Sequence, residues 1–298
     1  MSNVAVPLEK PVESAHAEGG HGGHHGPAHL HHHFTDAPQQ REANALGMWA
    51  FLITEVMTFS VLFFAYTLYR NQFDITAAQT GYYSPFAAGS HMLNGYLGFG
   101  NTLVLLCSSL TMASAVHCAV IKDKKWLVTW LCVTWVLGLT FLCVKGVEWT
   151  ADYHEGIMPR ANWNPADTLA EHGFYASLPD GVFGGAYPAN ARDIDGPGTL
   201  AQYRTMHGLT DQTEKFQGVV NPSALELFFC IYFCMTGLHA IHMIIGLGLV
   251  GTFIWHAKNG WFTDGGNDQP VEILGLYWHF VDIVWVFLYP LLYLIYRY

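Results

Sequence analysis

The amino-acid sequence predicts an all-α integral membrane protein, a bundle of five transmembrane helices with a long hydrophilic loop between the third and the fourth. Of its 298 residues, 51% are hydrophobic and only 12% are charged, whereas a typical soluble domain has about 25% charged residues. A helix needs about 20 mainly apolar residues to cross a bilayer core roughly 30 Å thick. Five stretches meet this requirement, namely residues 47–69, 94–120, 126–149, 225–254 and 273–296.

Polar segments divide the chain into four parts. Residues 1–46 form a polar, His-rich N-terminal tail that contains eight of the 17 histidines. The tail has no apolar periodicity and is expected to be disordered; it could bind a divalent metal weakly, although incidental histidines are the favoured interpretation. Residues 47–149 hold the first three helices, residues 150–223 form a hydrophilic acidic insert, and residues 224–298 hold the last two helices.

Lysine and arginine predict the orientation, because short cytoplasmic loops carry the excess of these residues. With the N-terminus inside, the inner segments hold six of them and the outer short segments only Arg70 and Arg297. The C-terminus and the insert are therefore expected outside. The insert has nine acidic and four basic residues, so it could steer a basic partner protein, although an ordinary solvated loop is the favoured interpretation. The net charge of −10 argues against nucleic acid as a partner.

Glu55 is the only acidic or basic residue within residues 47–69. Burial in an apolar segment disfavours the charged form of a carboxyl group. The hydroxyl groups of Thr54 and Thr58 lie close enough along the helix to satisfy part of it. Two roles are open for such a group: relaying protons, or tying two helices together.

Two further pairs of polar residues fall inside apolar segments, where each is costly and has to face protein or a cavity. His239 and His242 are three residues apart, as are His279 and Asp282. Haem ligation by the first pair would need a second helix, with His279 as the candidate, because two histidines on one helix cannot reach opposite faces of one haem. Structural histidines are the favoured interpretation. Asp282 is expected to bond to His279 or to a neighbour.

Lys145 and Glu148 lie near the outer end of the third apolar stretch. At a spacing of i, i+3 they can pair, and their long side chains are expected to reach the membrane interface. The six cysteines all lie in apolar segments without paired spacing, so they are expected to be buried free thiols rather than metal ligands. The sequence contains no motif of soluble enzyme chemistry, and no catalytic or metal-binding residue is predicted.

Four stretches in order along the chain resemble subunit III of the haem–copper respiratory oxidases, in a short five-helix bacterial form. The last is the most specific of the four. They are GMWAFLITEVMTFSVLFFAY (47–66), NTLVLLCSSLTMA (101–113), TGLHAIHMIIGLGLV (236–250) and YWHFVDIVWVFLYPLLYL (277–294).

The resemblance implies a non-catalytic subunit of a proton-pumping oxidase of aerobic electron transport in the bacterial inner membrane. Such a subunit binds no haem or copper, which lie in the partner subunits I and II, and it supports proton uptake by subunit I and its stability. Bound phospholipid is also implied. Separately, the acidic charge of the insert favours cytochrome c over quinol as the electron donor and as a partner that the insert could contact. Glu55 matches the family's buried, carbodiimide-reactive carboxyl. Other residues match its recurring polar positions, which serve in packing or in contact with lipid and other subunits: Glu148, His239, His242, His279 and Asp282.

Two features depart from the family pattern. Two helices that precede the Glu-bearing helix in the longer form are replaced here by the polar tail, and Lys145 stands where an uncharged polar residue is expected. The related accessory subunit of a nitric oxide reductase is an alternative function. A haem-binding or proton-conducting membrane protein that acts alone is a third.

Overall fold

The computed structural model describes residues 37–80, 83–164, 168–169, 172, 174–176, 218–262 and 268–295. Most of the His-rich tail, most of the acidic insert and Arg297 lie outside the described residues. The expectations of a disordered tail, of metal binding by it, and of partner steering by the insert therefore concern parts of the chain that the structure leaves undescribed.

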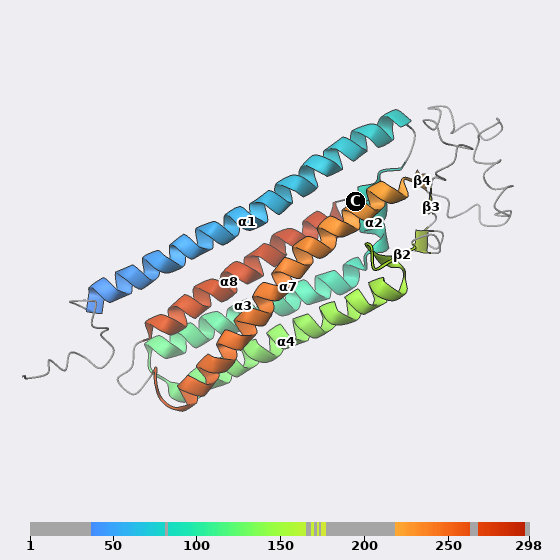
Figure 1. Cartoon of the computed structure of the whole chain (residues 1–298). Coiled ribbons are helices and arrows are strands. Elements are labelled where there is room, and N and C mark those ends of the chain that lie inside the picture. Colours follow the sequence, from blue (N-terminus) through green and yellow to red (C-terminus); the bar gives the residue numbers. More distant parts are fainter. Residues whose placement is uncertain are drawn as a thin grey trace, which may run out of the picture.

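Five long helices make up the molecule (Figure 1), and all five are long and apolar enough to cross a membrane. The predicted fold class, an all-α membrane bundle, is confirmed. The helices are α1 (Ala37–Thr80), α3 (Gly95–Val120), α4 (Lys124–His154), α7 (Pro222–Lys258) and α8 (Gln269–Tyr289). A π-helical turn, η2 (Pro290–Leu294), continues α8, and the short helix α2 (Pro85–Met92) precedes α3.

Side-chain caps set the starts of three of the five long helices. Asn94, Asp123 and Asn221 precede α3, α4 and α7, and each side chain accepts a hydrogen bond from a backbone N–H of the first turn. Such a cap satisfies a donor that has no partner within the helix. The acidic cap of α4 stands beside the basic turn at residues 122–125, where Lys122 adopts a positive φ of 59°.

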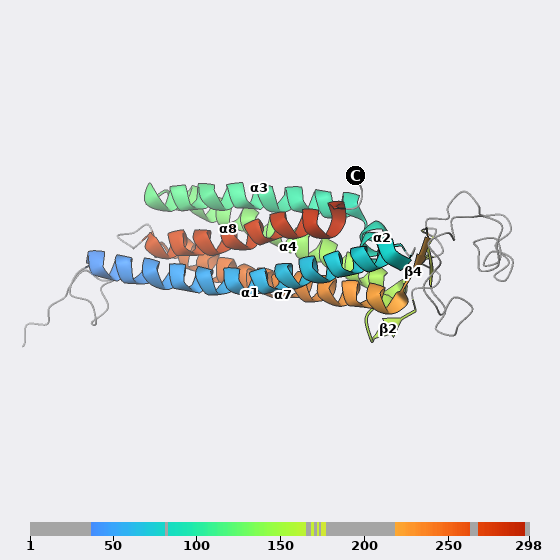
Figure 2. The same ribbon diagram turned by 90° about the horizontal axis from the view of Figure 1, so that it is seen from above.

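The helices α3, α4, α7 and α8 form a four-helix bundle, and α1 packs along one side of it against α7 and α8. The views in Figures 1 and 2 show α8 between α1 and α3. Only 17% of the apolar stretch of α1 is buried, against 61% for α8. Therefore α8 is the central element of the fold and α1 a peripheral one.

Aromatic side chains fill the centre of the bundle. Trp278 and Trp285 of α8 and Phe141 of α4 are fully buried. Gly138 allows the close approach of α4 to α8, because a Cβ atom there would lie 2.8 Å from Trp278 Cη2. A small residue at a helix interface is the usual device for close packing in a membrane.

The helix α1 has 44 residues and exceeds the predicted span 47–69 at both ends. At 1.5 Å per residue it is about 66 Å long, roughly twice the thickness of the hydrocarbon core. The run of apolar residues predicts only the part of the helix that crosses lipid. Good helix formers such as alanine, glutamine and glutamate extend the helix at its start. At that end Arg41 forms an ion pair with Asp268, with Nη2 and Oδ1 2.6 Å apart. Towards the other end the Tyr66 hydroxyl donates to the carbonyl of Leu291 at 2.9 Å.

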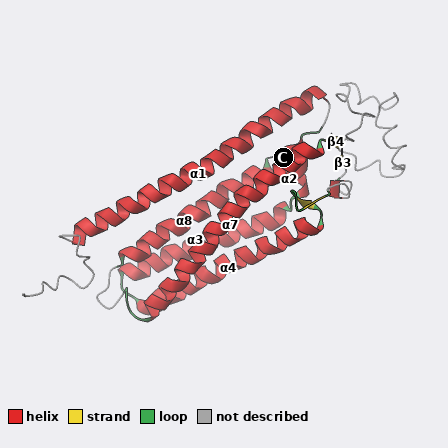
Figure 3. Ribbon diagram, in the orientation of Figure 1, coloured by secondary structure: helices red, strands yellow, loops and turns green. Residues whose placement is uncertain are grey.

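Short strands lie at one end of the bundle, shown in yellow in Figure 3. Strand β1 (Ile157–Met158) pairs antiparallel with β2 (Asn162–Trp163), and β3 (Phe174–Ala176) pairs parallel with β4 (Gly218–Val220). The start of α1 and the α3–α4 turn lie at the opposite end (Figures 1 and 2).

Candidate functional site

Glu55 of α1 meets His242 of α7 between the two helices. The carboxyl Oε2 and the imidazole Nε2 are 3.1 Å apart, and the two side chains are 21% and 11% exposed. The other ring nitrogen, Nδ1, lies 2.8 Å from the carbonyl oxygen of Leu238. A carbonyl oxygen only accepts, so Nδ1 is the donor.

Because Nδ1 donates to the backbone, there are two ways to form a hydrogen bond between Nε2 of His242 and the Glu55 carboxyl group. When Nδ1 carries the proton of a neutral imidazole, Nε2 is an acceptor and Glu55 has to donate from a protonated carboxyl group. When the imidazole is cationic, Nε2 donates to a carboxylate instead. In both cases one proton is shared across the 3.1 Å contact. The contact therefore ties α1 to the bundle, and a hydrogen bond across it requires one proton between the carboxyl group and Nε2.

The expectation that Thr54 and Thr58 satisfy Glu55 was wrong. Thr54 Oγ1 donates to the carbonyl of Phe51 at 2.7 Å, and Thr58 Oγ1 donates to the carbonyl of Thr54 at 3.0 Å. Short hydroxyl side chains in helices commonly bond back to the preceding turn. The true partner, His242, is 187 residues away in sequence.

A second polar cluster is buried where α4, α7 and the end of α8 meet. Lys145 and Glu148 form an ion pair, with Nζ and Oε2 3.0 Å apart, and their side chains are only 4% and 5% exposed. Tyr232 and Tyr293 complete the cluster. The Glu148 Oε1 atom accepts from the Tyr232 hydroxyl at 3.0 Å and from the Tyr293 hydroxyl at 2.5 Å.

The prediction that Lys145 and Glu148 reach the membrane interface was wrong. The ammonium group donates to the hydroxyl groups of Tyr232 and Tyr293, at 3.2 and 3.0 Å, and it lies 5.1 Å from the centre of the Trp285 ring. A carboxylate, two hydroxyls and an aromatic face thus replace the water that an interfacial lysine would have. No local pattern in the sequence connects the two tyrosines with α4.

The three histidines His239, His242 and His279 lie at different helix interfaces. His239 is 1% exposed and lies against Phe141 and Trp285, with ring centroids 5.5 and 5.1 Å away. His279 is half-buried and bonds through Nδ1 to the Ser109 hydroxyl at 2.7 Å. With His242 directed to α1, the structure does not gather these histidines around one space.

Asp282 does not bond to His279. It is 3% exposed, and neither carboxylate oxygen makes a hydrogen bond of acceptable geometry in the described part of the chain, although the Ser109 side chain is close. Among the described residues, no group of three or more histidine, cysteine, aspartate or glutamate side chains could hold a metal ion.

The cysteines were expected to be buried, yet Cys107, Cys143, Cys230 and Cys234 are exposed on the outer faces of the helices as free thiols.

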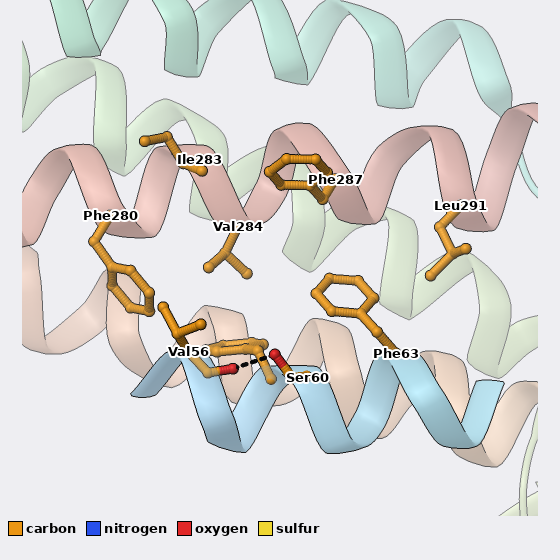
Figure 4. A pocket seen from close by; sticks show the side chains of 9 residues that line it. Val56, Ser60, Phe63, Phe280, Ile283, Val284, Phe287 and Leu291 are labelled. Atoms are coloured by element: carbon orange, nitrogen blue, oxygen red, sulfur yellow. Dashed lines mark hydrogen bonds between the residues drawn. The ribbon is translucent and has the colours of Figure 1, made fainter. Parts of the chain in front are cut away.

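An apolar pocket of about 450 Å³ lies beside the Glu55–His242 pair, between α1 and the end of α8. Figure 4 shows side chains of the two helices pointing towards one another across it. Among the described residues that line it, only Ser60 carries a hydroxyl group, which donates to the Val56 carbonyl at 2.6 Å. The pocket is lined by Val56, Phe59, Ser60, Phe63, Phe280, Ile283, Val284, Phe287 and Leu291.

The sequence of this chain matches known proteins over the helices that carry these contacts. The family model described as cytochrome c oxidase subunit III matches residues 28–156 and 213–296, which is well over half of the chain. The chain belongs to the cytochrome c oxidase subunit III family. The residues of the Glu55–His242 pair, of the Lys145 cluster and of the Ser109–His279 contact all lie inside the matched segments. Most of the acidic insert lies between them.

Individual relatives differ in how much of their length is matched. The chain is 25% identical to quinol oxidase subunit 3 of Bacillus spizizenii, over 89% of this chain and 96% of the relative. It is 25% identical to cytochrome c oxidase subunit 3 of Sus scrofa, over 83% of this chain and 67% of the relative. The match to cytochrome c oxidase subunit 3 of Thermostichus vulcanus is 33% identical, but it spans only about a third of that relative, 36%. The match to cytochrome c oxidase subunit 3 of Synechocystis covers 30% of that relative.

Proposed function

We propose that this chain is a non-catalytic core subunit, subunit III, of a proton-pumping haem–copper terminal oxidase, with haem and copper in partner subunits I and II. The observation that carries the proposal is the family match across all five spans. The geometry supports it, because the Lys145 cluster and the Glu55–His242 and Ser109–His279 contacts join helices of one bundle.

The Glu55–His242 pair supports a part in proton handling. The hydrogen bond between the carboxyl and imidazole groups requires one proton, and both groups are partly exposed at the edge of the bundle. Such a pair can take up a further proton on the carboxyl group and stay hydrogen-bonded, because the Nε2–H of a cationic imidazole still donates to a carboxyl oxygen. The role proposed for Glu55 is support of proton uptake by subunit I.

The membrane proposed is the bacterial inner membrane, with the N-terminus inside and the insert and C-terminus outside. Basic residues support this orientation: Lys122, Lys124 and Lys125 form the α3–α4 turn, and Lys258 ends α7. Arg41 lies near the start of α1, at the same end of the bundle. An excess of basic residues at one end marks the cytoplasmic side.

The proposed electron donor is cytochrome c, which an acidic insert would attract. A quinol-oxidising complex is the second candidate, because the relative matched over 96% of its length is named quinol oxidase subunit 3. The apolar pocket between α1 and α8 supports the expectation of bound phospholipid, since about 450 Å³ of apolar space can take part of a hydrocarbon chain.

The first experiment is purification of the complex in mild detergent, followed by a reduced-minus-oxidised optical spectrum. Haem a absorbance in a larger partner subunit is expected. A chain that purifies without a haem-bearing partner, or that absorbs as a haem protein by itself, would overturn the proposed function.

The second experiment compares Glu55→Gln with Thr67→Val, a matched control that removes an exposed polar group from the same helix. We expect both complexes to assemble and reduce oxygen. Only Glu55→Gln should abolish carbodiimide labelling and lower either proton pumping or the number of turnovers before inactivation. If Glu55→Gln pumps and lasts like wild type, the proton role is wrong. If it fails to assemble, the carboxyl acts as a helix tie.

A further inference from the structure

The outward face shared by α3 and α8 is mainly apolar over the central part of both helices, with the exposed His117 and Glu272 near one end. The two helices lie side by side, and α3 is on the opposite side of α8 from α1 (Figure 2). The exposed side chains recur at intervals of three, four and seven residues, which places them in one strip on each helix. They include Leu103, Leu106 and Leu110 on α3 and Leu276 and Val286 on α8, each between 37% and 70% exposed. Ile283 lies at the edge of this face and also lines the pocket between α1 and α8.

One polar contact interrupts this face near the middle of both helices. His279 lies in the same strip of α8 as Leu276 and Val286, and its Nδ1 bonds to the Ser109 hydroxyl of α3 at 2.7 Å. The His279 ring is only half-buried. Its second nitrogen, Nε2, makes no hydrogen bond within the part of the chain that the structure describes, and it is not enclosed by the protein.

Lipid cannot satisfy an imidazole nitrogen at this depth. The hydrocarbon core offers neither donors nor acceptors, and ionisable residues inside membranes almost always face protein or a water-filled cavity. The outward side of α7 differs in this respect, because its exposed mid-span residues Ile241, Ile244 and Ile245 are all apolar. Lipid can cover that side of α7, whereas the α3–α8 face requires a polar partner.

We propose that the α3–α8 face is the docking surface for a transmembrane helix of the haem-bearing subunit, and that this helix places a hydrogen-bonding group opposite His279 Nε2. The proposal rests on the proposed function, because it assigns one face of this chain to the partner that the function requires. The partner helix is apolar for most of its length, to match the leucine and valine strips. At mid-span it carries a serine, threonine, asparagine or carboxylate side chain, or a free backbone carbonyl.

Photo-crosslinking on the intact complex tests the location. A photoreactive amino acid is placed at Leu106 or Leu110, and in matched controls at Ile241 or Ile244; all four side chains are exposed and can be replaced without filling the core. Adducts with the haem-bearing subunit from the first pair only are expected. Adducts from the α7 positions only, or only lipid adducts from Leu106 and Leu110, would overturn the inference. Both results would leave the proposed function standing, because the haem-bearing subunit still co-purifies.

Substitution of His279 tests the polar contact. An interhelical hydrogen bond in a membrane is worth enough to change an association constant about three-fold to eighteen-fold. We expect His279→Ala to lower retention of the haem-bearing subunit in a detergent titration by that factor. His279→Gln should restore much of it, and Ile241→Ala should have no effect. Equal retention by wild type and His279→Ala, or no rescue by glutamine, would show that no partner group bonds to Nε2.

Discussion

Replacing Lys145 by methionine tests the buried cluster on α4. At 3.0 Å and an effective dielectric constant of about 20, the attraction between the two charges is roughly 5 kcal/mol before desolvation. Desolvation costs several kcal/mol for each ion, so the pair as a whole contributes little net stability. Removing one partner is different, because it leaves an uncompensated charge at a site that is about 95% enclosed. We expect Lys145→Met to lower the free energy of unfolding by about 3–5 kcal/mol.

The matching double variant, Lys145→Met with Glu148→Gln, separates charge from packing. Glutamine keeps an acceptor for the hydroxyl groups of Tyr232 and Tyr293 but carries no charge. The double variant should therefore be more stable than Lys145→Met alone, by roughly 2 kcal/mol or more. Unfolding would be followed by helical circular dichroism during an SDS titration in mixed micelles. If the losses of stability in Lys145→Met and in Glu148→Gln, each measured alone, simply add in the double variant, the ion pair is not the origin of the loss in Lys145→Met. The same conclusion follows if the double variant is the least stable of all.

Three smaller perturbations test packing, an interhelical hydrogen bond and a helix cap. Gly138→Ala should cost about 1–3 kcal/mol, because its methyl group meets Trp278 at 2.8 Å; Gly146→Ala on the same helix has open space and should not destabilise, and equal loss in both would refute the packing argument. Tyr66→Phe should cost about 0.5–1.5 kcal/mol in the same assay, because it removes the bond to a carbonyl of η2, and an unchanged midpoint would show that this bond is unimportant. Asp123→Ala should cost about 0.5–2 kcal/mol, whereas Asp123→Asn, which keeps an acceptor for the N–H of residue 126, should cost less.

Composition and local pattern were sufficient for the number, order and approximate position of the five spans. Each span is a run of apolar residues, and water-to-lipid transfer acts on such runs residue by residue without reference to the rest of the chain. The same reasoning marked Glu55, His239, His242, His279 and Asp282 as unusual, because a polar residue in lipid is visible in one segment. Their roles as family positions stay a prediction.

The partners of these residues could not be predicted in the same way. The contacts Glu55–His242 and Ser109–His279 join helices separated by 187 and 170 residues. They depend on which helix lies beside which, and on the rotation of each helix about its axis. Lys145 illustrates the same limit, because an interfacial and a buried lysine have the same sequence neighbours. Only the placement of Tyr232, Tyr293 and Trp285 around it distinguishes the two.

The contact between Glu55 and His242 also constrains the order of events during synthesis. Chains are made from the N-terminus at about 5–20 residues per second, and 187 residues separate the two side chains. The segment that contains Glu55 is therefore made about 10–40 s before its imidazole exists. During that interval α1 has neither α7 nor α8 to pack against. The helix that is least buried in the finished fold is thus the one that waits longest for its neighbours, and its carboxyl group must be tolerated, or shielded by another protein, until α7 is complete.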